Sequence, residues 1–496
     1  RETYAHTRRL FGQKGRDMPR ESSTDERMTA VAQAHTAFRQ LRTSTSDERS
    51  RWLVGIAEAV EEHRSALVAV ADEETTLGAG RLNSEIDRTI YQLHHFRDAI
   101  AQEKHRRVID QPGDPDASPQ PRPSLKQMRV PLGPVAVWGA SNFPFAFGVL
   151  GGDTASALAA GCPVIAIEHP GHPRTSELLA EIAQGALAKF DAPRGTFALL
   201  AGRATGASLI ADAQVKAGAF TGSYAGGRAL FDLASSRPDP IPFFAEMGSV
   251  NPVFITRQAV RQRGGEIARG LVDSATLGVG QFCTKPGLVF VSDSVDFVTM
   301  VEDRVANVAP APMLTEAIAA NYRQRRSEMM GNSTSRATLA NASSADESEG
   351  SAAVLIIDHE ALKESWSVLS EECFGPLMVI VSCDSDSDLG DWAQQVPGSL
   401  TATIHACEDD PNDRAVVNRL VDELQDSAGR IIFNGWPTGV AVSAAMHHGG
   451  PHPATMNPIF TSVGAQAIDR FLKPVTMQGF PDELVPAWLA GGATSA

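Results

Sequence analysis

The chain has 496 residues, of which 43% are hydrophobic and 21% charged, and its formal net charge is −15. This composition is typical of a soluble globular protein long enough for two or three domains. A strongly acidic chain lacks the basic face that nucleic acids and anionic membranes need, so both kinds of partner are excluded. No apolar run approaches the roughly 20 residues of a membrane span. Five scattered cysteines are too few for a disulfide framework, which favours a reducing, cytoplasmic location.

The first hundred residues predict a layer of helices. Residues 1 to about 22 are polar, lack the apolar region of a secretory signal, and are expected to form a loose arm. Capping-box spacing at 23–26 and again at 45–48 predicts the starts of two helices. An apolar face with a period of 3.6 residues over 86–100 predicts a third. These helices need a sheet on which to bury their apolar faces.

Residues 106–131 form a different kind of segment. Short β-like runs flank a tip rich in Pro and Asp at 111–123. A hairpin of this length has little core of its own, so it either packs on another subunit or stays mobile. We prefer the first alternative, which makes the protein a homo-oligomer.

From Pro134 onward, short apolar runs alternate with helical segments. The expected strands are 135–138, 164–167, 197–200 and 215–220, and the expected helices are 153–160 and 175–190. This alternation predicts an α/β fold with a parallel, doubly wound sheet. Ligands of such sheets bind beyond the carboxyl ends of the strands, which directs attention to the loops at 139–144 and 221–226.

The loop at 221–226 is a glycine turn between a strand and a helix. Gly222 and Gly226 would let the helix N-terminus approach a pyrophosphate, whose charge the free N–H groups favour. The turn is not a GxGxxG motif, and glycines at a strand–helix turn commonly serve only the turn. The pattern alone leaves both readings open.

Two isolated side chains have the chemistry of a catalytic pair. Cys283 lies between a helix-compatible run (271–279) and a β-like run (288–291), where a thiol can face a cleft between domains. The alternative is a structural cysteine, since free Cys is among the most buried residue types. Glu246 lies beside apolar residues, where a raised pKa would suit a general base; the alternative is a solvated strand end.

Two later segments are expected to carry no chemistry. Residues 331–352 are rich in Ser, Ala, Asn, Gly and Glu and are expected to be a surface insertion. The pair His447 and His448 is expected to bind no metal, because adjacent histidines lack ligand spacing and no carboxylate or cysteine joins them.

Five motifs occur in the order and rough spacing of the aldehyde dehydrogenase superfamily. They lie at 141–144, 221–226, 246–252, 281–284 and 371–376. Each is weak alone, but five in order are strong, and the chain resembles this superfamily from about residue 24 to about 480. The closer resemblance is to the branch of α-ketoglutaric semialdehyde (2,5-dioxovalerate) dehydrogenases, which also holds an NADP-linked fatty aldehyde dehydrogenase.

The resemblance implies an aldehyde dehydrogenase-like fold of two doubly wound α/β domains plus a small β oligomerisation element. The dinucleotide-binding domain is expected at 1–110 and 132–244, and the catalytic domain at 245–445. The oligomerisation element is expected at 111–131 and 465–496, giving a homodimer or homotetramer.

The resemblance also implies the NAD(P)-dependent oxidation of an aldehyde to an acid. Cys283 would attack the aldehyde carbonyl to form a thiohemiacetal and then a thioester. The Asn142 amide and the backbone N–H of Cys283 would hold the oxyanion. Glu246 would activate the water that releases the acid.

The remaining contacts follow from the same resemblance, which implies no metal. Residues expected to touch NAD or NADP are Ser141, Ile167, Gly222, Ser223, Gly226, Glu372 and Phe374. Residues expected to touch the aldehyde are Phe143, Gln281, Phe282 and Thr284.

Two departures from the family pattern bear on specificity. In the family, a Lys commonly contacts the adenosine ribose at the place that Ile167 and Glu168 occupy here. The choice between NAD and NADP as cofactor therefore stays open. Residues 441–443 also depart from the pattern of the branch, so the identity of the aldehyde substrate stays open. The first expectation is 2-oxoglutarate semialdehyde. The alternatives are a longer aliphatic aldehyde, or a cofactor-poor paralogue without turnover.

Overall fold

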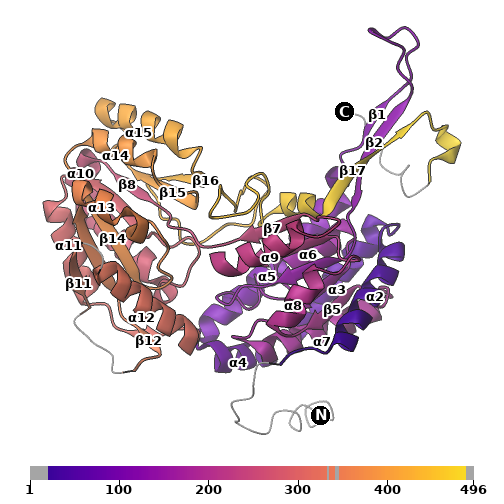
Figure 1. The fold of residues 1–496 in the computed structure, drawn as a ribbon, viewed down its shortest axis with the longest axis horizontal. Coiled ribbons are helices and arrows are strands. Elements are labelled where there is room, and N and C mark those ends of the chain that lie inside the picture. The colour runs from indigo at the N-terminus through magenta and orange to yellow at the C-terminus, as the bar shows by residue number, and fades with distance from the viewer. Residues whose placement is uncertain (1–19, 332–333, 341–345, 487–496) are drawn as a thin grey trace.

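The computed structural model describes residues 20–331, 334–340 and 346–486. The loose arm expected at 1–22 therefore lies almost entirely outside the described residues. Two α/β lobes lie side by side, and a narrow β arm projects from the lobe that contains the earlier residues (Figure 1). These three parts match the predicted two domains and small β element.

A five-stranded parallel sheet forms the centre of the first domain, with the order β5-β4-β3-β6-β7. Its strands are β3 (Val135–Trp138), β4 (Val164–Ile167), β5 (Phe197–Leu200), β6 (Ala217–Thr221) and β7 (Phe243–Glu246). The order reverses between β3 and β6, and such a switch point opens a crevice at the carboxyl ends of the strands. The loops at 139–144 and 221–226 leave these two strands, as predicted.

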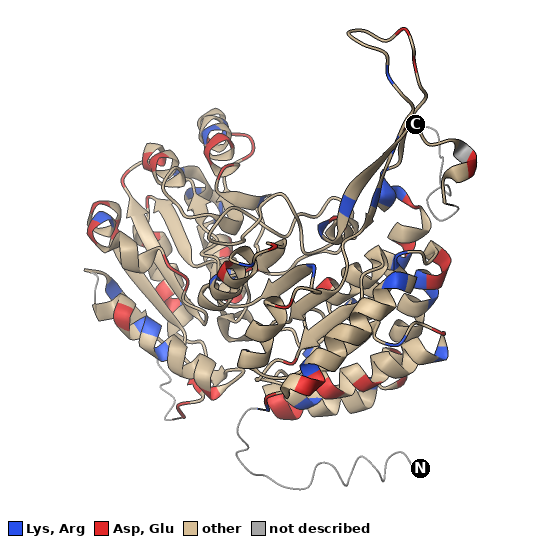
Figure 2. Ribbon diagram, turned by 45° about the vertical axis from the view of Figure 1, so that its right-hand side comes forward, with Lys and Arg blue, Asp and Glu red and all other residues tan. Residues whose placement is uncertain are grey.

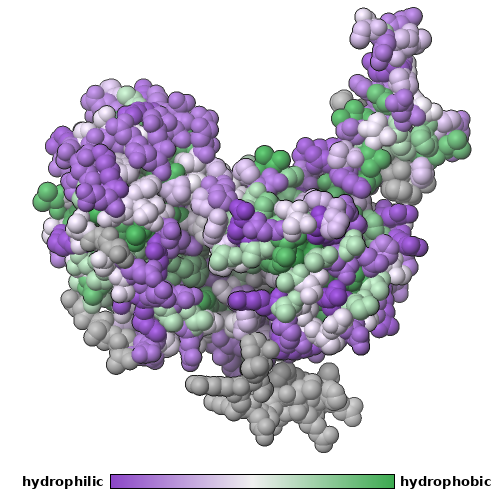
Figure 3. Space-filling view, in the orientation of Figure 1, coloured by the Kyte–Doolittle hydropathy of each residue, from purple (hydrophilic) through white to green (hydrophobic). Residues whose placement is uncertain are grey.

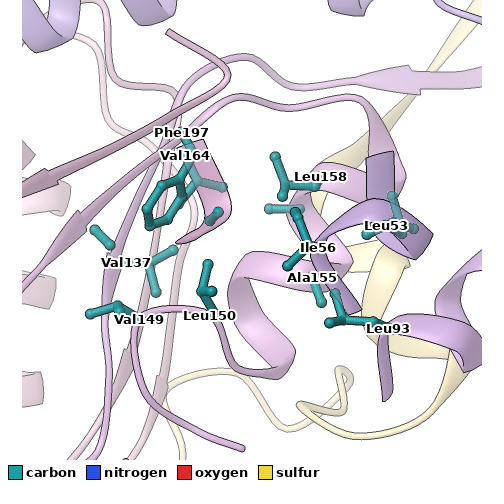
Figure 4. Close-up of a cluster of buried hydrophobic side chains, with 14 of the residues drawn as sticks. Leu53, Ile56, Leu93, Val137, Val149, Leu150, Ala155, Leu158, Val164 and Phe197 are labelled. Atoms are coloured by element: carbon teal, nitrogen blue, oxygen red, sulfur yellow. The ribbon is translucent and has the colours of Figure 1, made fainter. Parts of the chain in front are cut away.

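Alternate residues of these strands enter two separate apolar clusters, so both faces of the sheet are covered. Val135 and Val137 enter one cluster, whereas Ala136 enters the other. Figure 4 shows the first cluster, where Val137 and Val164 face helical side chains such as Ile56. Helices on that face are α3 (Ser46–Glu62), α4 (Arg64–Thr75), α5 (Ala79–Ala101), α6 (Gly152–Ala160) and α7 (Pro173–Lys189). Helices on the other face are α2 (Thr24–Leu41), α8 (Arg203–Ile210) and α9 (Tyr224–Ser235).

Both predicted capping boxes are present. The Ser23 hydroxyl accepts from the backbone N–H of Glu26, whose carboxylate accepts from the backbone N–H of Ser23, and Thr45 and Glu48 repeat the arrangement. The structure ends α3 at Glu62 and begins α4 at Arg64.

A seven-stranded sheet forms the second domain, with the order β11-β13-β14-β9-β8-β15-β16. Every neighbouring pair is parallel except β11 with β13. Its strands are β8 (Val253–Ile255), β9 (Leu288–Ser292), β11 (Arg336–Leu339), β13 (Ala353–Asp358), β14 (Leu377–Cys383), β15 (Ser399–His405) and β16 (Ala428–Phe433). Its helices are α10 (Arg257–Thr276), α11 (Val295–Ala306), α12 (Glu316–Gly331), α13 (His359–Leu369), α14 (Asp386–Ala393) and α15 (Pro411–Leu424).

The expected surface insertion at 331–352 is partly wrong. It contains the antiparallel edge strand β11 and the short strand β12 (Glu349–Gly350), which pairs with β10 (Ala311–Pro312). The polar composition suits an edge strand, of which only one side is paired. Residues 332–333 and 341–345 lie outside the described residues.

The arm is a three-stranded antiparallel sheet of β1 (Ile109–Gln111), β2 (Leu125–Pro131) and β17 (Leu472–Gln478). The expected boundary at residue 465 is too early. Residues Ala465–Phe471 form a 3-10 helix, η3, that packs on α6 of the first domain. There the buried Arg470 forms an ion pair with Asp153 at 2.8 Å, so the arm begins at Leu472.

None of the described helices has the length and apolar character needed to cross a bilayer. All five cysteines of the chain lie in the described part and are free thiols.

Candidate active site

A cavity of about 680 Å³ lies at the switch point of the first sheet and extends to the second domain. Loops after β3 and β6 contribute one wall, and the loops that carry Cys283 and Glu372 contribute the other. The structure thereby brings eight predicted residues to one cavity: Ser141, Asn142, Gly222, Ser223, Glu246, Cys283, Glu372 and Phe374.

The loop that carries Cys283 is held in an unusual backbone conformation. After α10, three successive residues, Gly278, Val279 and Gly280, have φ of 56°, 58° and 66°. This left-handed region is costly for a β-branched residue such as Val279, so the surroundings must enforce it. A Cβ on Gly280 would collide with the backbone of Gly375, which shows how closely this loop packs against the loop of Glu372.

Asn251 fixes the backbone at Cys283. Its buried amide nitrogen donates to the carbonyl oxygens of Cys283 at 2.8 Å and Lys285 at 2.9 Å. Its amide oxygen accepts from the hydroxyls of Ser249 at 2.7 Å and Thr401 at 3.0 Å. Every polar atom of this side chain is therefore satisfied, and a fully satisfied buried network is rigid.

Three reactive groups meet at one point of the cavity. The imidazole Nε2 of His448 lies 2.9 Å from the Glu246 carboxylate and 3.7 Å from the Cys283 sulfur. His448 and Glu246 are both buried, and the Ser462 hydroxyl donates to the other carboxylate oxygen of Glu246 at 2.6 Å. Both contacts involve the same ring nitrogen, so an Nε2–H that donates to the carboxylate also lies beside the sulfur, where it can stabilise a thiolate.

The reason given for excluding a metal at the histidine pair is wrong. A carboxylate and a cysteine do join His448, and one atom from each of the three side chains lies within 4.8 Å of the others. Zinc takes such a donor set. Sequence spacing missed this cluster because its members come from three distant segments. The absence of a metal stays a prediction.

The pKa of Glu246 contradicts the expectation of a raised value. Burial alone would raise it, but His448, Ser462 and Arg470 outweigh burial and lower the pKa below its usual range. The pKa of the Cys283 thiol is raised well above its usual range, first by burial and then by the charges of Glu246 and Glu372. In this resting arrangement the carboxylate is ionised and the thiol keeps its proton.

The side chain of Asn142 is buried, and its expected role at an oxyanion stays a prediction. Its side-chain amide donates to the carbonyl oxygen of Gln281 at 2.8 Å, so it faces the loop that carries Cys283. Its backbone carbonyl accepts from Arg81 at 2.6 Å. An amide donor beside the nucleophile can stabilise negative charge without titrating.

The four residues expected to touch the aldehyde divide into two pairs. Phe143 and Phe282 meet edge to face with ring centroids 5.3 Å apart, and Phe282 precedes Cys283 directly in the chain. Gln281 and Thr284 are each only 1% exposed. The Gln281 amide is used internally, accepting from the backbone N–H of Leu314 and donating to the carbonyl oxygen of Gly278, so a substrate contact there is not supported.

Two arginines that the sequence analysis overlooked lie beside these aromatic rings. Arg81 lies over Phe143 and Phe282, and Arg88 lies over Phe147 at 5.4 Å from the ring centroid. One nitrogen of Arg88 donates to the carbonyl oxygen of Val440 at 2.5 Å. Its other two side-chain nitrogens are buried and have no hydrogen-bond partner in the described chain. The sequence did contain a signal for these two arginines, because both recur at helical spacing on the otherwise apolar face of α5.

The opposite end of the cavity presents groups suited to a dinucleotide. Ser223 caps α9 by accepting from the backbone N–H of Gly226 at 3.2 Å, and this helix N-terminus opens on the cavity beside Gly222. Gly226 itself does not line the cavity. Burial raises the pKa of Glu372 to about 7, although Lys285 partly offsets this effect.

Ile167 ends β4, and its side chain is 5% exposed and packs in an apolar cluster with Leu200. Its expected contact with a dinucleotide stays a prediction. The next residue, Glu168, has a buried carboxylate oxygen with no hydrogen-bond partner among the described residues. Burial and the nearby charge of Glu177 raise the pKa of Glu168 to about 7.

Known proteins resemble this chain over nearly its whole length. The model of the aldehyde dehydrogenase family matches residues 17–476. The α-ketoglutaric semialdehyde dehydrogenase 2 of Azospirillum brasilense is 42% identical over 461 residues, 92% of this chain and 87% of that protein. The α-ketoglutaric semialdehyde dehydrogenase of Acinetobacter baylyi is 39% identical over 475 residues, 95% of this chain and 90% of that protein.

Solved structures share the fold at lower identity. The 1-pyrroline-5-carboxylate dehydrogenase of Thermus thermophilus has a TM-score of 0.76 and 18% identity, covering 92% of this chain and 86% of that one. The glyceraldehyde-3-phosphate dehydrogenase GapN of Methanocaldococcus jannaschii, complexed with NADP, has a TM-score of 0.76 and 18% identity, covering 94% and 99%. With the family model and the two relatives above, these findings establish that the chain belongs to the aldehyde dehydrogenase family.

Proposed function

We propose that this aldehyde dehydrogenase oxidises 2-oxoglutarate semialdehyde to 2-oxoglutarate, with Cys283 as the nucleophile. The observation that carries the proposal is the buried, partly unpartnered Arg88 guanidinium, which lies over the ring of Phe147, itself in contact with the ring of His448. An aldehyde with a carboxylate at its far end supplies the anion that this cation lacks. The names of the two relatives at 42% and 39% identity support the same substrate.

In the proposed mechanism, the Cys283 thiol loses its proton to solvent in the cavity and its sulfur attacks the aldehyde carbon. The Nε2–H of His448, which donates to the ionised Glu246 at 2.9 Å, lies 3.7 Å from the sulfur and stabilises the thiolate. The Asn142 amide and the backbone N–H of Cys283 hold the oxygen of the thiohemiacetal. A dinucleotide held beside Gly222 and Ser223 would supply the hydride-accepting chemistry by which the adduct on Cys283 becomes a thioester. The Glu246 carboxylate then takes the proton from the water that hydrolyses the thioester.

The residues of the cavity fit a dinucleotide, and we propose NAD in preference to NADP. A carboxylate at the end of the second strand of such a sheet accepts from the 2′-hydroxyl of the adenosine ribose. Glu168 follows β4 directly and has an unpartnered carboxylate oxygen. Among the described lining residues, Arg325 is the one Lys or Arg, and it is paired with Glu328 and Glu371, so a 2′-phosphate finds no free cation.

A longer aliphatic aldehyde is the second candidate substrate. The aromatic rings of Phe143, Phe147 and Phe282 provide apolar surface for it near Cys283. Such a substrate would leave Arg88 unpaired, which is costly for a buried charge. A paralogue without turnover is disfavoured by the assembled catalytic cluster.

The arm is the proposed oligomerisation surface. Four large apolar side chains are exposed on it or just after it: Ile109 at 53%, Val475 at 41%, Phe480 at 50% and Leu484 at 67%. Figure 3 shows apolar side chains gathered on the lower part of the arm. A homodimer or homotetramer would cover them, and the five free thiols suit the reducing cytoplasm proposed for the enzyme.

Replacing Arg88 tests the substrate. We expect Arg88→Leu to raise KM for 2-oxoglutarate semialdehyde about 10- to 100-fold, since a hydrogen bond to a charged group contributes about 1.5–3 kcal/mol. KM for an uncharged aliphatic aldehyde should stay the same or fall. Arg97→Leu is the matched control, because Arg97 is on the same helix and pairs at the surface with Asp98. Equal losses for both aldehydes would contradict the proposal.

The cofactor preference should depend on pH. Because the pKa of Glu168 is raised to about 7, its carboxyl is neutral below that pH and ionised above it. The ratio of the Kd of NADP to the Kd of NAD should therefore rise between pH 6 and pH 8, as measured by calorimetry. Glu168→Gln should make this ratio independent of pH. Tighter binding of NADP than NAD at pH 8 would refute the assignment.

The rate at which Cys283 is alkylated depends on the fraction of its thiol that is ionised, so it shows which neighbouring group sets the pKa of the thiol. Glu246 raises the pKa of the thiol, so Glu246→Gln should lower that pKa and speed the reaction with iodoacetamide at pH 8. A fall of one in the pKa raises the thiolate fraction about tenfold. His448→Asn should slow the same reaction. If Glu246→Gln slows alkylation instead, the carboxylate is the direct base for the thiol.

Light scattering of the intact chain tests the arm. We expect a mass of two or four subunits for the unaltered chain and a smaller mass for Val475→Asp, because a charge there opposes burial. Val295→Asp changes an equally apolar residue, 78% exposed in the second domain, and should leave the mass unchanged. A monomeric unaltered chain would exclude this role.

A further inference from the structure

A second cavity lies at the base of the arm and shares no lining residue with the active site. Its volume is about 140 Å³, roughly ten times the ~10–15 Å³ that one water needs on this measure. Its walls are the start of α3, the short 3-10 helix η1 (Lys104–Arg106), the end of β2 and the first residue of β17. Several Lys and Arg residues, blue in Figure 2, lie on the ribbon where the arm meets the first domain.

This cavity has more positive than negative charge. It is lined by Arg42, Arg49, Arg106, Arg129 and His105, and by one carboxylate, Glu103. Arg129 is paired with Asp469 at 2.8 Å, and Arg106 with Glu103 at 3.5 Å. Within the described chain, Arg42 and Arg49 have no carboxylate partner. The cavity thus has an excess of positive charge, although the chain as a whole has a net charge of −15.

The two buried groups of the cavity have unused hydrogen-bonding capacity. Arg49 is 7% exposed and donates only to neutral oxygens, the carbonyl of Ala160 at 3.1 Å and the hydroxyl of Ser46 at 3.4 Å. Among the described residues, its Nε has no hydrogen-bond partner, and neither does Nδ1 of His105, a residue that is 8% exposed. A buried guanidinium without a counter-charge is unfavourable unless an anion accompanies it.

The titration of these groups agrees with a missing anion. Burial, reinforced by Arg106, lowers the pKa of Arg49 to about 10. Burial, reinforced by Arg49 and Arg106, lowers the pKa of His105 to about 3. A negative charge in the cavity would oppose both effects and would hold the guanidinium groups in place.

We propose that this cavity binds a small oxyanion with two or more acceptor oxygens, held by Arg49 and Arg42 with His105 beside it. Side chains carry the site, because the capping box of Thr45 and Glu48 already uses the N-terminus of α3. The anion joins α3 and η1 to the strands β2 and β17, so it ties the arm to the first domain. This inference is independent of the proposed substrate, since no catalytic residue contributes.

Calorimetry with inorganic phosphate on the full-length enzyme tests the site. We expect saturable binding of one phosphate per chain and a rise of Tm with phosphate concentration. Arg49→Met and Arg42→Met should each weaken Kd about tenfold or more, as expected for one charge-assisted hydrogen bond. Arg51→Met, an exposed residue of the same helix that does not line the cavity, should bind as the unaltered chain does. Because Arg42 is exposed, its variant remains informative if the buried Arg49 variant does not fold.

Competition between phosphate and other anions distinguishes the possible natural occupants of the cavity. Succinate, 2-oxoglutarate and chloride are titrated against phosphate, and the tightest competitor identifies a dicarboxylate or a phosphate as the natural occupant. The His105 ring resonances should move on binding, and they should not move in Arg49→Met. Absence of saturable binding by any oxyanion would overturn the proposal, as would an equal Kd in Arg42→Met and Arg51→Met.

Discussion

The contact of His448 with both Glu246 and Cys283 is the interaction on which the rest of the site depends. Glu246 ends the last strand of the first sheet, Cys283 lies on a loop of the second domain, and His448 comes from the segment that returns toward the arm. The three atoms meet only when both domains and this segment have folded together. Burying a carboxylate is costly alone, and the imidazole and the Ser462 hydroxyl offset that cost.

The resting thiol is protected by the same charges that serve the reaction. Burial and two carboxylates keep Cys283 protonated, which limits oxidation and alkylation before substrate arrives. The backbone beside it is fixed by Asn251 and by Lys285, whose buried ammonium donates to the carbonyl oxygens of Cys373 and Leu377. Removing the Asn251 amide would leave several buried polar groups unsatisfied, each at about 1–3 kcal/mol. Rigidity of this loop is thus built from hydrogen bonds between distant segments.

Elements that depend on residues close together in the sequence were predicted correctly. The parallel strands, the capping boxes at Ser23 and Thr45, and the loops at the switch point follow from spacing and residue type. The motifs also led to Cys283, Glu246 and Asn142, which the structure places around one cavity or against its loops. His448 and Arg88 were not assigned to the site, because the sequence does not show which distant residues they contact. The pKa of Glu246 was mispredicted for the same reason, because His448 supplies the missing positive partner.

The proposed mechanism requires a covalent bond between the substrate carbon and the Cys283 sulfur. Rapid acid quench of the enzyme mixed with 2-oxoglutarate semialdehyde and NAD, followed by peptide mass spectrometry, measures this bond directly. We predict an acyl adduct on the peptide that contains Cys283, formed within one turnover and absent from Cys283→Ala. Turnover without such an adduct, or turnover that persists in Cys283→Ala, would contradict the central claim.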